Sequence, residues 1–235
     1  MFLIYEEFAG RADAVRARIA RACERSGRRA DEVELLAVTK TQPPEAADYA
    51  ARYGLRAVGE NRVQEGSGKR ALSTAAVAWE LIGHLQSNKA GLAVRHFDRV
   101  QSVDSAKLLE LLDRAASGEG RVFPVLLQIN AGADPAKFGA DPADAPALLE
   151  SALARRNLRV EGLMTIAPLS RDLSVARRAF ENLREIRARL AADFATPLRE
   201  LSMGMSADLE EAVSAGSTQI RVGTALFGDR AQTGA

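Results

Sequence analysis

One lysine stands at the end of an apolar run, where its amine could do chemistry. The stretch from Leu35 to Glu45 reads LLAVTKTQPPE, in which four apolar residues lead directly into Thr39 and Lys40. A short apolar run followed by two prolines predicts a buried strand that ends near the lysine. A desolvated amine near other cations has a lowered pKa and reacts with aldehydes. Two plainer roles stay open at this point, because Lys40 could snorkel to water or pair with an acid such as Glu60.

Two glycine-containing turns in the last third of the chain could bind an anion. LSMGMSADLEEA reads as strand, turn and helix, with Ser206 or Asp208 near the helix start. Backbone N–H groups and the Ser206 hydroxyl could hold an anion there. GSTQIRVGTALFG follows and places Gly223 and Thr224 at or near the end of another strand. An amine facing such a phosphate site suggests a phosphorylated aldehyde, and pyridoxal 5′-phosphate (PLP) is the obvious one.

The elements that must position these residues alternate regularly along the chain. Eight short β-rich runs are separated by helical patterns or helix-sized gaps, which is typical of a single (β/α)8 barrel of the TIM type. A doubly wound open sheet is the alternative. Only DRAQTGA follows the last strand, so we expect the extra amphipathic helix before the first strand to cover the gap left by an eighth helix. The predicted strands are 33–40, 56–61, 79–85, 99–105, 123–130, 160–167, 198–205 and 219–228, within one α/β domain over 1–235 whose core spans about 30–228.

Composition excludes several classes of function. The chain has 235 residues and a formal net charge of +1, so nothing in its charge favours nucleic acid or an anionic membrane. The arginine-rich stretch at 11–29 alternates with alanine and predicts a solvated helix face. One cysteine, Cys23, suits a reducing cytoplasm, and two histidines are too few for a histidine metal cluster. The start, MFLIYEEF, reads as neither a signal peptide nor a membrane span, so we expect the protein in the cytoplasm. We also expect a monomer.

The motifs closely resemble those of the pyridoxal phosphate homeostasis proteins, a family with the barrel fold of the alanine racemase N-terminal domain. The resemblance covers nearly the whole chain from Leu35 to Gly228. Its motifs are specific in combination rather than singly. They are AVTK at 37–40, GENRVQE at 59–65, IGHLQSNK at 82–89, NAGADPAKFG at 130–139, GLMTI at 162–166, LSMGMSADLEEA at 201–212 and GSTQIRVGTALFG at 216–228.

The resemblance implies a cofactor site. Lys40 would hold PLP as an internal aldimine, with no strong turnover. Ser206, together with the backbone and hydroxyl of Gly223 and Thr224, would bind the phosphate, and Asn61 would line the pocket. The protein would buffer PLP inside the cell or deliver it to apo PLP enzymes, whose identities the sequence does not reveal.

Arg221 would face the pyridine nitrogen of the cofactor by the same resemblance. A guanidinium is a permanent donor, so the ring nitrogen would stay unprotonated and the ring would be a weaker electron sink. A rim cation in a salt bridge is the other interpretation. The chain departs from the family pattern at Glu80, where a histidine usually follows the tryptophan, and at Asp134, where glutamate is commoner. We expect these departures to affect only loop contacts or a partner surface.

A PLP-dependent amino acid racemase is the alternative function, and a barrel that forms an imine with another aldehyde phosphate is a third. A two-base racemase needs a second proton-transferring group opposite the lysine, which alanine racemases supply as a tyrosine from a second domain. The three tyrosines, Tyr5, Tyr49 and Tyr53, all lie in the first quarter of the chain. The roles of His84, Lys89 and Lys137 near the strand ends stay open.

Overall fold

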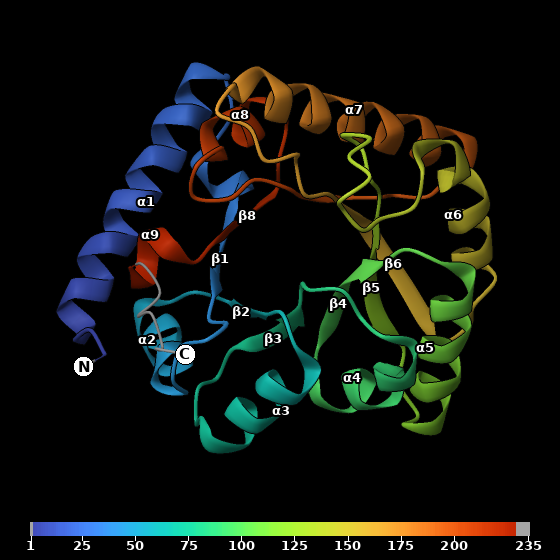
Figure 1. Cartoon of the computed structure of the whole chain (residues 1–235), viewed down its shortest axis with the longest axis horizontal. Coiled ribbons are helices and arrows are strands. Elements are labelled where there is room, and N and C mark those ends of the chain that lie inside the picture. Colours follow the sequence, from blue (N-terminus) through green and yellow to red (C-terminus); the bar gives the residue numbers. More distant parts are fainter. Residues whose placement is uncertain (1, 229–235) are drawn as a thin grey trace.

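Eight parallel strands close into a barrel in which each strand pairs with its neighbours in sequence, and β1 pairs with β8 (Figure 1). The computed structural model describes residues 2–228. This topology confirms the predicted (β/α)8 barrel and rules out the doubly wound open sheet. The strands are β1 (Glu34–Val38), β2 (Ala57–Glu60), β3 (Ala78–Leu81), β4 (Arg99–Val103), β5 (Phe123–Gln128), β6 (Leu158–Met164), β7 (Glu200–Ser202) and β8 (Gln219–Val222).

Helices surround the strands and bury their apolar stripes against the outer face of the barrel (Figure 1). Within residues 2–228 no helix combines the length and apolar character needed to cross a membrane. The α-helices are α1 (Tyr5–Arg25), α2 (Glu45–Tyr53), α3 (Val63–Leu72), α4 (Ala90–His96), α5 (Ala106–Gly118), α6 (Ala145–Leu153), α7 (Leu173–Asp193), α8 (Leu209–Ser214) and α9 (Thr224–Phe227), with 3-10 turns η1 (Ala30–Glu32), η2 (Ser87–Lys89) and η3 (Pro142–Asp144).

Helix α1 fills the place that a long final helix would otherwise take. It buries Phe8, Val15 and Ile19 and contacts both α8 and α9, beside which it runs in Figure 1. The Arg18 guanidinium donates two hydrogen bonds of 2.8 Å to the Glu210 carboxylate on α8. The expectation that the N-terminal helix covers this gap is confirmed.

The last predicted strand, 219–228, is wrong in its second half. The β1–β8 ladder ends at the pair Ala37 and Val222, and the chain then turns into α9. Backbone N–H groups of Leu226 and Phe227 donate to the Gly223 carbonyl, so hydrogen bonding within one helical turn replaces the ladder. The other strands also end earlier than predicted, because the chain beyond each strand end turns away into the loops at the barrel mouth.

The barrel interior has an apolar side and a polar side. Leu36, Val38, Ala57 and Ile82 form a small cluster inside β1 to β3. Side chains alternate along each strand, so Ile82 and Glu80 point inward from β3 while the intervening Leu81 joins the outer core. The polar side is formed by residues of β3, β4, β7 and β8 and lies beneath the candidate site described next.

Candidate functional site

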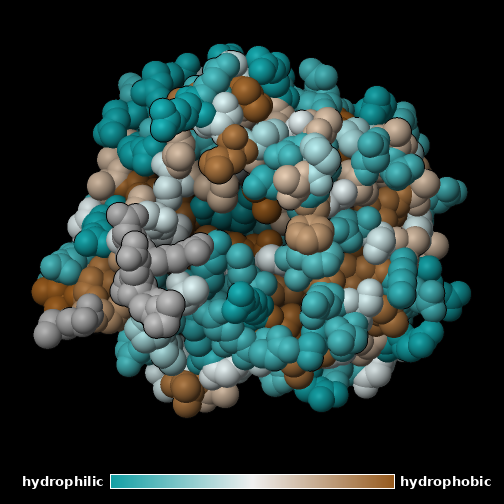
Figure 2. All heavy atoms as spheres, viewed as in Figure 1, coloured by the Kyte–Doolittle hydropathy of each residue, from teal (hydrophilic) through white to brown (hydrophobic). Residues whose placement is uncertain are grey.

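A cavity of about 550 Å³ opens at the carboxyl-terminal ends of the strands. The face of the molecule over the barrel is hollowed near its middle in Figure 2, with polar and apolar residues around the hollow. The volume is in the range of small-molecule and cofactor sites. All six residues predicted for the site line this one cavity, namely Lys40, Asn61, Ser206, Arg221, Gly223 and Thr224.

Lys40 is half-buried and follows β1 after a single intervening residue, Thr39, which is only 1% exposed. The next residue, Thr41, adopts a positive φ of 62°, which is uncommon for a β-branched side chain. Pro43 and Pro44 then end the turn, and α2 begins at Glu45. The strand therefore stops as the sequence predicts, and a strained residue directly follows the lysine.

A buried ion-pair cluster holds the residues on both sides of Lys40. The Lys69 ammonium donates to the Thr39 carbonyl at 2.7 Å, to Glu60 Oε1 at 2.9 Å and to Glu65 Oε1 at 2.6 Å. Thr39 Oγ1 also donates to Glu60 Oε1, at 2.6 Å, while the Thr41 N–H donates to Glu65 Oε1 at 2.5 Å. The three ammonium hydrogens thus have three acceptors, and the cluster anchors the backbone at both neighbours of the lysine.

The carboxylates of this cluster differ in environment. Glu60 is fully buried, and burial raises its pKa, although Thr39 and Lys69 counteract the shift. Burial also pushes the pKa of Glu65 upward, but hydrogen bonds from Lys69 and Thr41 hold it below its ordinary value. Glu60 was one of the acids suggested as a partner of Lys40. Its Oε1 atom accepts a hydrogen bond from Lys69, a residue that the sequence did not single out.

Asn61 reaches the cavity from the end of β2. The turn after β3 packs tightly against its backbone, because a Cβ atom on Gly83 would lie 2.3 Å from the Asn61 carbonyl oxygen. The Gly83 carbonyl in turn accepts a hydrogen bond of 2.6 Å from Ser102 Oγ on β4. Only glycine fits this close approach.

The two predicted anion-binding turns adjoin one another. The Ala225 N–H points to Ser206 Oγ at 3.4 Å, which joins the turn after β7 to the start of α9. Asp208, rather than Ser206, occupies the N-cap of α8, and its carboxylate accepts from the Met205 N–H at 2.6 Å. Ser206 therefore remains available to the cavity that it lines together with Gly223 and Thr224.

We predict that Gly204→Ala destabilises the protein by about 2–4 kcal/mol, because it combines a clash with backbone strain. Gly204 has a φ of 94°, and a Cβ atom there would lie 2.3 Å from Ala212 Cβ. Urea unfolding measures the change. The matched control is Gly91→Ala inside α4, where a Cβ would meet nothing within 4 Å, and we expect it to stabilise the helix by about 0.5–1 kcal/mol. Equal effects of the two variants would contradict this account.

Arg221 lies inside the barrel rather than on its rim. It is 4% exposed, and its guanidinium donates from Nη1 to Ser202 Oγ and from Nη2 to the Thr165 carbonyl, both at 2.8 Å. Burial lowers the pKa of Arg221 to about 10, with Asp208 and Glu80 acting in the opposite direction. It is therefore charged at neutral pH. The geometry contradicts the rim-cation interpretation.

Three further residues with open roles fall at or near the mouth. His84 lines the cavity, stacks on Phe138 with ring centroids 3.9 Å apart, and lies 3.9 Å from the Asp104 carboxylate. Lys137 also lines the cavity. Lys89 lies in η2 and is not among the described residues that line the cavity.

Glu80 is the residue near the site whose location differs from the one expected from the sequence. The departure at this position was expected to affect only loop contacts or a partner surface. The structure instead places Glu80 in the barrel interior, 5% exposed, where it binds Arg99 and Gln101. The alternation along β3, with Leu81 outward and Ile82 inward, was the signal that could have placed it. Asp134, the other departure, lies in the loop after β5, where its backbone bonds the Asn130 side chain.

Comparison with known proteins defines the class of this barrel. The family described as "Alanine racemase, N-terminal domain" matches residues 11–231. A pyridoxal phosphate homeostasis protein of Pseudomonas aeruginosa is 42% identical over 217 residues, which cover 92% of this chain and 93% of the relative. The corresponding protein of Escherichia coli is 38% identical over 224 residues, covering 92% and 94%. The chain belongs to the family of pyridoxal phosphate homeostasis proteins.

Solved structures agree with this assignment. PipY of Synechococcus elongatus, with PLP bound, superposes with a TM-score of 0.83 at 40% identity, and the match covers 94% of this chain and all of that one. Alanine racemase of Clostridium difficile gives a TM-score of 0.78 at 13% identity, covering 97% of this chain and 58% of the racemase. The second likeness supports the fold alone.

Proposed function

We propose that this protein binds PLP in the cavity at the barrel mouth and serves PLP homeostasis by holding or delivering the cofactor. One observation carries the proposal: Lys40 shares a single cavity with Ser206, Gly223 and Thr224, which come from the opposite end of the chain. Membership of the pyridoxal phosphate homeostasis family and the PLP bound in PipY support it. We further propose that a single barrel domain, residues 1–235, suffices as a cytoplasmic monomer.

The cavity residues fit the two ends of such a cofactor. PLP supplies an aldehyde that can bond to an amine and an aromatic ring that withdraws electrons. The Lys40 amine would attach covalently, at the rim that the Lys69 cluster holds in place. Ser206 Oγ and the backbone at Gly223 and Thr224 would bind the phosphate, and Asn61 would line the ring pocket.

The same residues argue against strong turnover. Arg221, a permanent donor, would keep a ring nitrogen that faces it unprotonated and so weaken the ring as an electron sink. Tyr5, Tyr49 and Tyr53 are all described, and none lines the cavity. They belong to an aromatic cluster with Phe8 between α1 and α2. The second proton-transferring group of a two-base racemase is thus not supplied by a tyrosine at this mouth.

Mixing the PLP-loaded protein with an apo aminotransferase tests the function directly. We expect the acceptor to gain activity, while alanine racemisation, assayed in parallel, stays at the level of the Lys40→Ala variant. An equal concentration of free PLP shows how much of the transfer passes through solution. Racemisation clearly above the Lys40→Ala level would contradict the carrier function and favour the racemase.

We predict that Ser206→Ala weakens PLP retention by about 1–3 kcal/mol, because it removes a hydroxyl donor to a charged phosphate. Equilibrium dialysis of the loaded protein measures the change. Ser67→Ala is the matched control, since the Ser67 hydroxyl lies on α3 and donates only to the Gln64 carbonyl among its described partners. Equal retention by the two variants would remove Ser206 from the phosphate site.

A further inference from the structure

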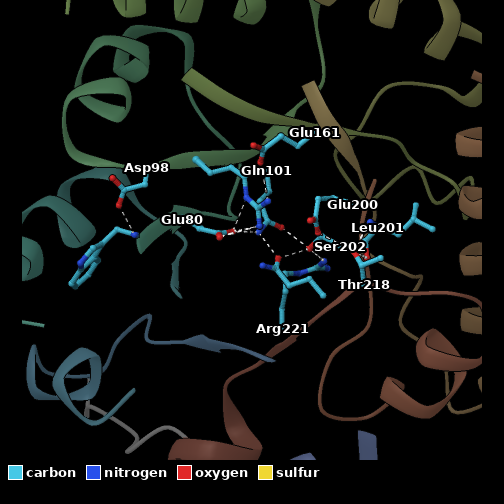
Figure 3. Close-up of polar contacts among 12 residues, drawn as sticks. Glu80, Asp98, Gln101, Glu161, Glu200, Leu201, Ser202, Thr218 and Arg221 are labelled. Atoms are coloured by element: carbon cyan, nitrogen blue, oxygen red, sulfur yellow. Dashed lines mark hydrogen bonds and ion pairs between the residues drawn. The ribbon is translucent and has the colours of Figure 1, made fainter. Parts of the chain in front are cut away.

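A chain of hydrogen bonds crosses the barrel interior beneath Arg221 (Figure 3). Arg221 Nη1 donates to Ser202 Oγ at 2.8 Å, and Ser202 Oγ lies 2.6 Å from Gln101 Oε1. The Gln101 amide nitrogen donates to Glu80 Oε2, and Arg99 donates to the same carboxylate from Nε at 3.1 Å and from Nη2 at 3.0 Å. The chain thus links Arg221, which lines the cavity, to the Glu80–Arg99 ion pair deeper in the barrel, which we call the barrel floor.

The carboxylate at the end of this chain sets its direction. An ionised carboxylate can only accept, so Gln101 must turn its amide nitrogen toward Glu80 and its oxygen toward Ser202. Ser202 has one hydroxyl hydrogen, which it then donates to Gln101, leaving its lone pairs to accept from Arg221. All the hydrogen bonds between Arg221 and Glu80 therefore point toward Glu80.

The other contacts inside the barrel agree with this direction. Gln219 Oε1 accepts from the same Gln101 nitrogen at 2.7 Å and lies 3.1 Å from Ser202 Oγ, farther than the Gln101 oxygen at 2.6 Å. Arg99 makes a second ion pair on its far side, from Nη1 to Glu161 at 3.1 Å. Glu161 thus pairs with Arg99 but is not a member of the hydrogen-bond chain that reaches Arg221.

The members of the chain are isolated from solvent. Gln101 and Ser202 are fully buried and Glu80 is 5% exposed. In such surroundings hydrogen bonds are strong and an unpaired polar group is costly, so the loss of one member is not readily replaced by water. Burial raises the pKa of Glu80, and Arg99 and Gln101 counteract the shift. Glu80 also stabilises the charged form of Arg221 electrostatically.

We propose that Glu80 is a positioning residue for Arg221, acting through Gln101 and Ser202 to hold the guanidinium toward the cavity. Only one consequence of this inference rests on the proposed function, namely that the oriented guanidinium contacts the ring of PLP. The orientation itself is a property of the protein without cofactor. The departure from the family pattern at Glu80 therefore bears on the pocket floor rather than on a loop.

Rotation of the Arg221 guanidinium about its Nε–Cζ bond, measured by NMR in the cofactor-free protein, tests the proposal. The signal is assigned by its loss in Arg221→Lys. We expect rotation to become at least about tenfold faster in Glu80→Met and in Ser202→Ala, since each removes an acceptor on which the chain depends. Glu80→Gln keeps an acceptor oxygen without the charge and should restore most of the restriction.

Glu161→Gln is the matched control, because it disturbs Arg99 without touching the chain to Arg221. We expect it to leave the rotation within about twofold of the parent protein. Ser202 belongs to neither the Glu80–Arg99 nor the Glu161–Arg99 ion pair. Ser202→Ala therefore still tests the proposal if Glu80→Met does not fold. Unchanged rotation in Ser202→Ala, or equal acceleration in Glu161→Gln and Glu80→Met, would overturn the proposal.

A second readout separates this inference from the proposed function. In the PLP-loaded protein, we expect the absorption band of the bound cofactor to shift in Glu80→Met and Ser202→Ala and to stay in place in Glu161→Gln. If the parent protein restrains Arg221 but does not bind PLP, the proposed function is contradicted and the positioning role of Glu80 is not. If the parent protein binds PLP but Glu80→Met and Ser202→Ala change neither the rotation rate of Arg221 nor the absorption spectrum, only the positioning role is contradicted.

Discussion

Lys40→Ala abolishes covalent retention of PLP if the cavity works as proposed. Borohydride treatment of the loaded parent protein should fix one cofactor per chain, visible as a mass increase on the peptide that contains Lys40. The variant should show no increase and no yellow colour, because the other proposed contacts hold the phosphate and ring without a carbon–nitrogen bond. Intact-protein and peptide mass spectrometry measure the result.

Lys137→Ala is the matched control, since Lys137 lines the same cavity at its mouth. We expect this variant to retain the full adduct on Lys40. A fixed adduct found on Lys137 or Lys89 of the parent protein, with the Lys40 peptide unmodified, would refute the assignment of the covalent site.

Lys69→Met should lower the free energy of unfolding by about 3–5 kcal/mol. The Lys69 side chain is 10% exposed and its partner Glu60 is fully buried, so the substitution leaves a buried carboxylate without its cation. It also removes the donor to the Thr39 carbonyl beside Lys40. Urea unfolding measures stability, and we expect PLP retention to fall as well because the strand end loses an anchor.

Two further variants test whether the buried Lys69 cluster contributes more to stability than an exposed ion pair does. Arg177→Met breaks an exposed pair with Glu181 on α7 and should cost at most about 1 kcal/mol. Adding Glu60→Gln to Lys69→Met should recover part of the loss, because it removes the unpaired charge. A cost for Lys69→Met no larger than that for Arg177→Met would show that the buried cluster does not stabilise the fold.

Much of the site was predictable because chain direction carries so much information in a parallel barrel. Once eight strands were recognised, Lys40, Ser206 and Gly223 had to converge, since each follows the carboxyl-terminal end of a strand. The family motifs then indicated the ligand. The same reasoning failed for the extent of the last strand, because the four-residue helix α9 replaces its predicted second half, although Thr224 still lines the cavity. An apolar TALF sequence has no periodicity that separates a strand from one helical turn.

The residues behind the site were not predictable from local pattern. Glu65 and Lys69 stand four apart on α3, which in sequence looks like an exposed helix pair. Only the fold shows that Lys69 points inward to Glu60 and the Thr39 carbonyl. The alternation along β3 could have placed Glu80 inside the barrel, but its partners depend on the register of β3 against β4 and on closure of the barrel.

A crystal structure of the protein grown with excess PLP tests the central claim most directly. We predict continuous density from the Lys40 side-chain nitrogen to the cofactor, with the phosphate against Ser206, Gly223 and Thr224. Density for a cofactor joined to another lysine, or a Lys40 side chain turned away from bound PLP, would contradict it.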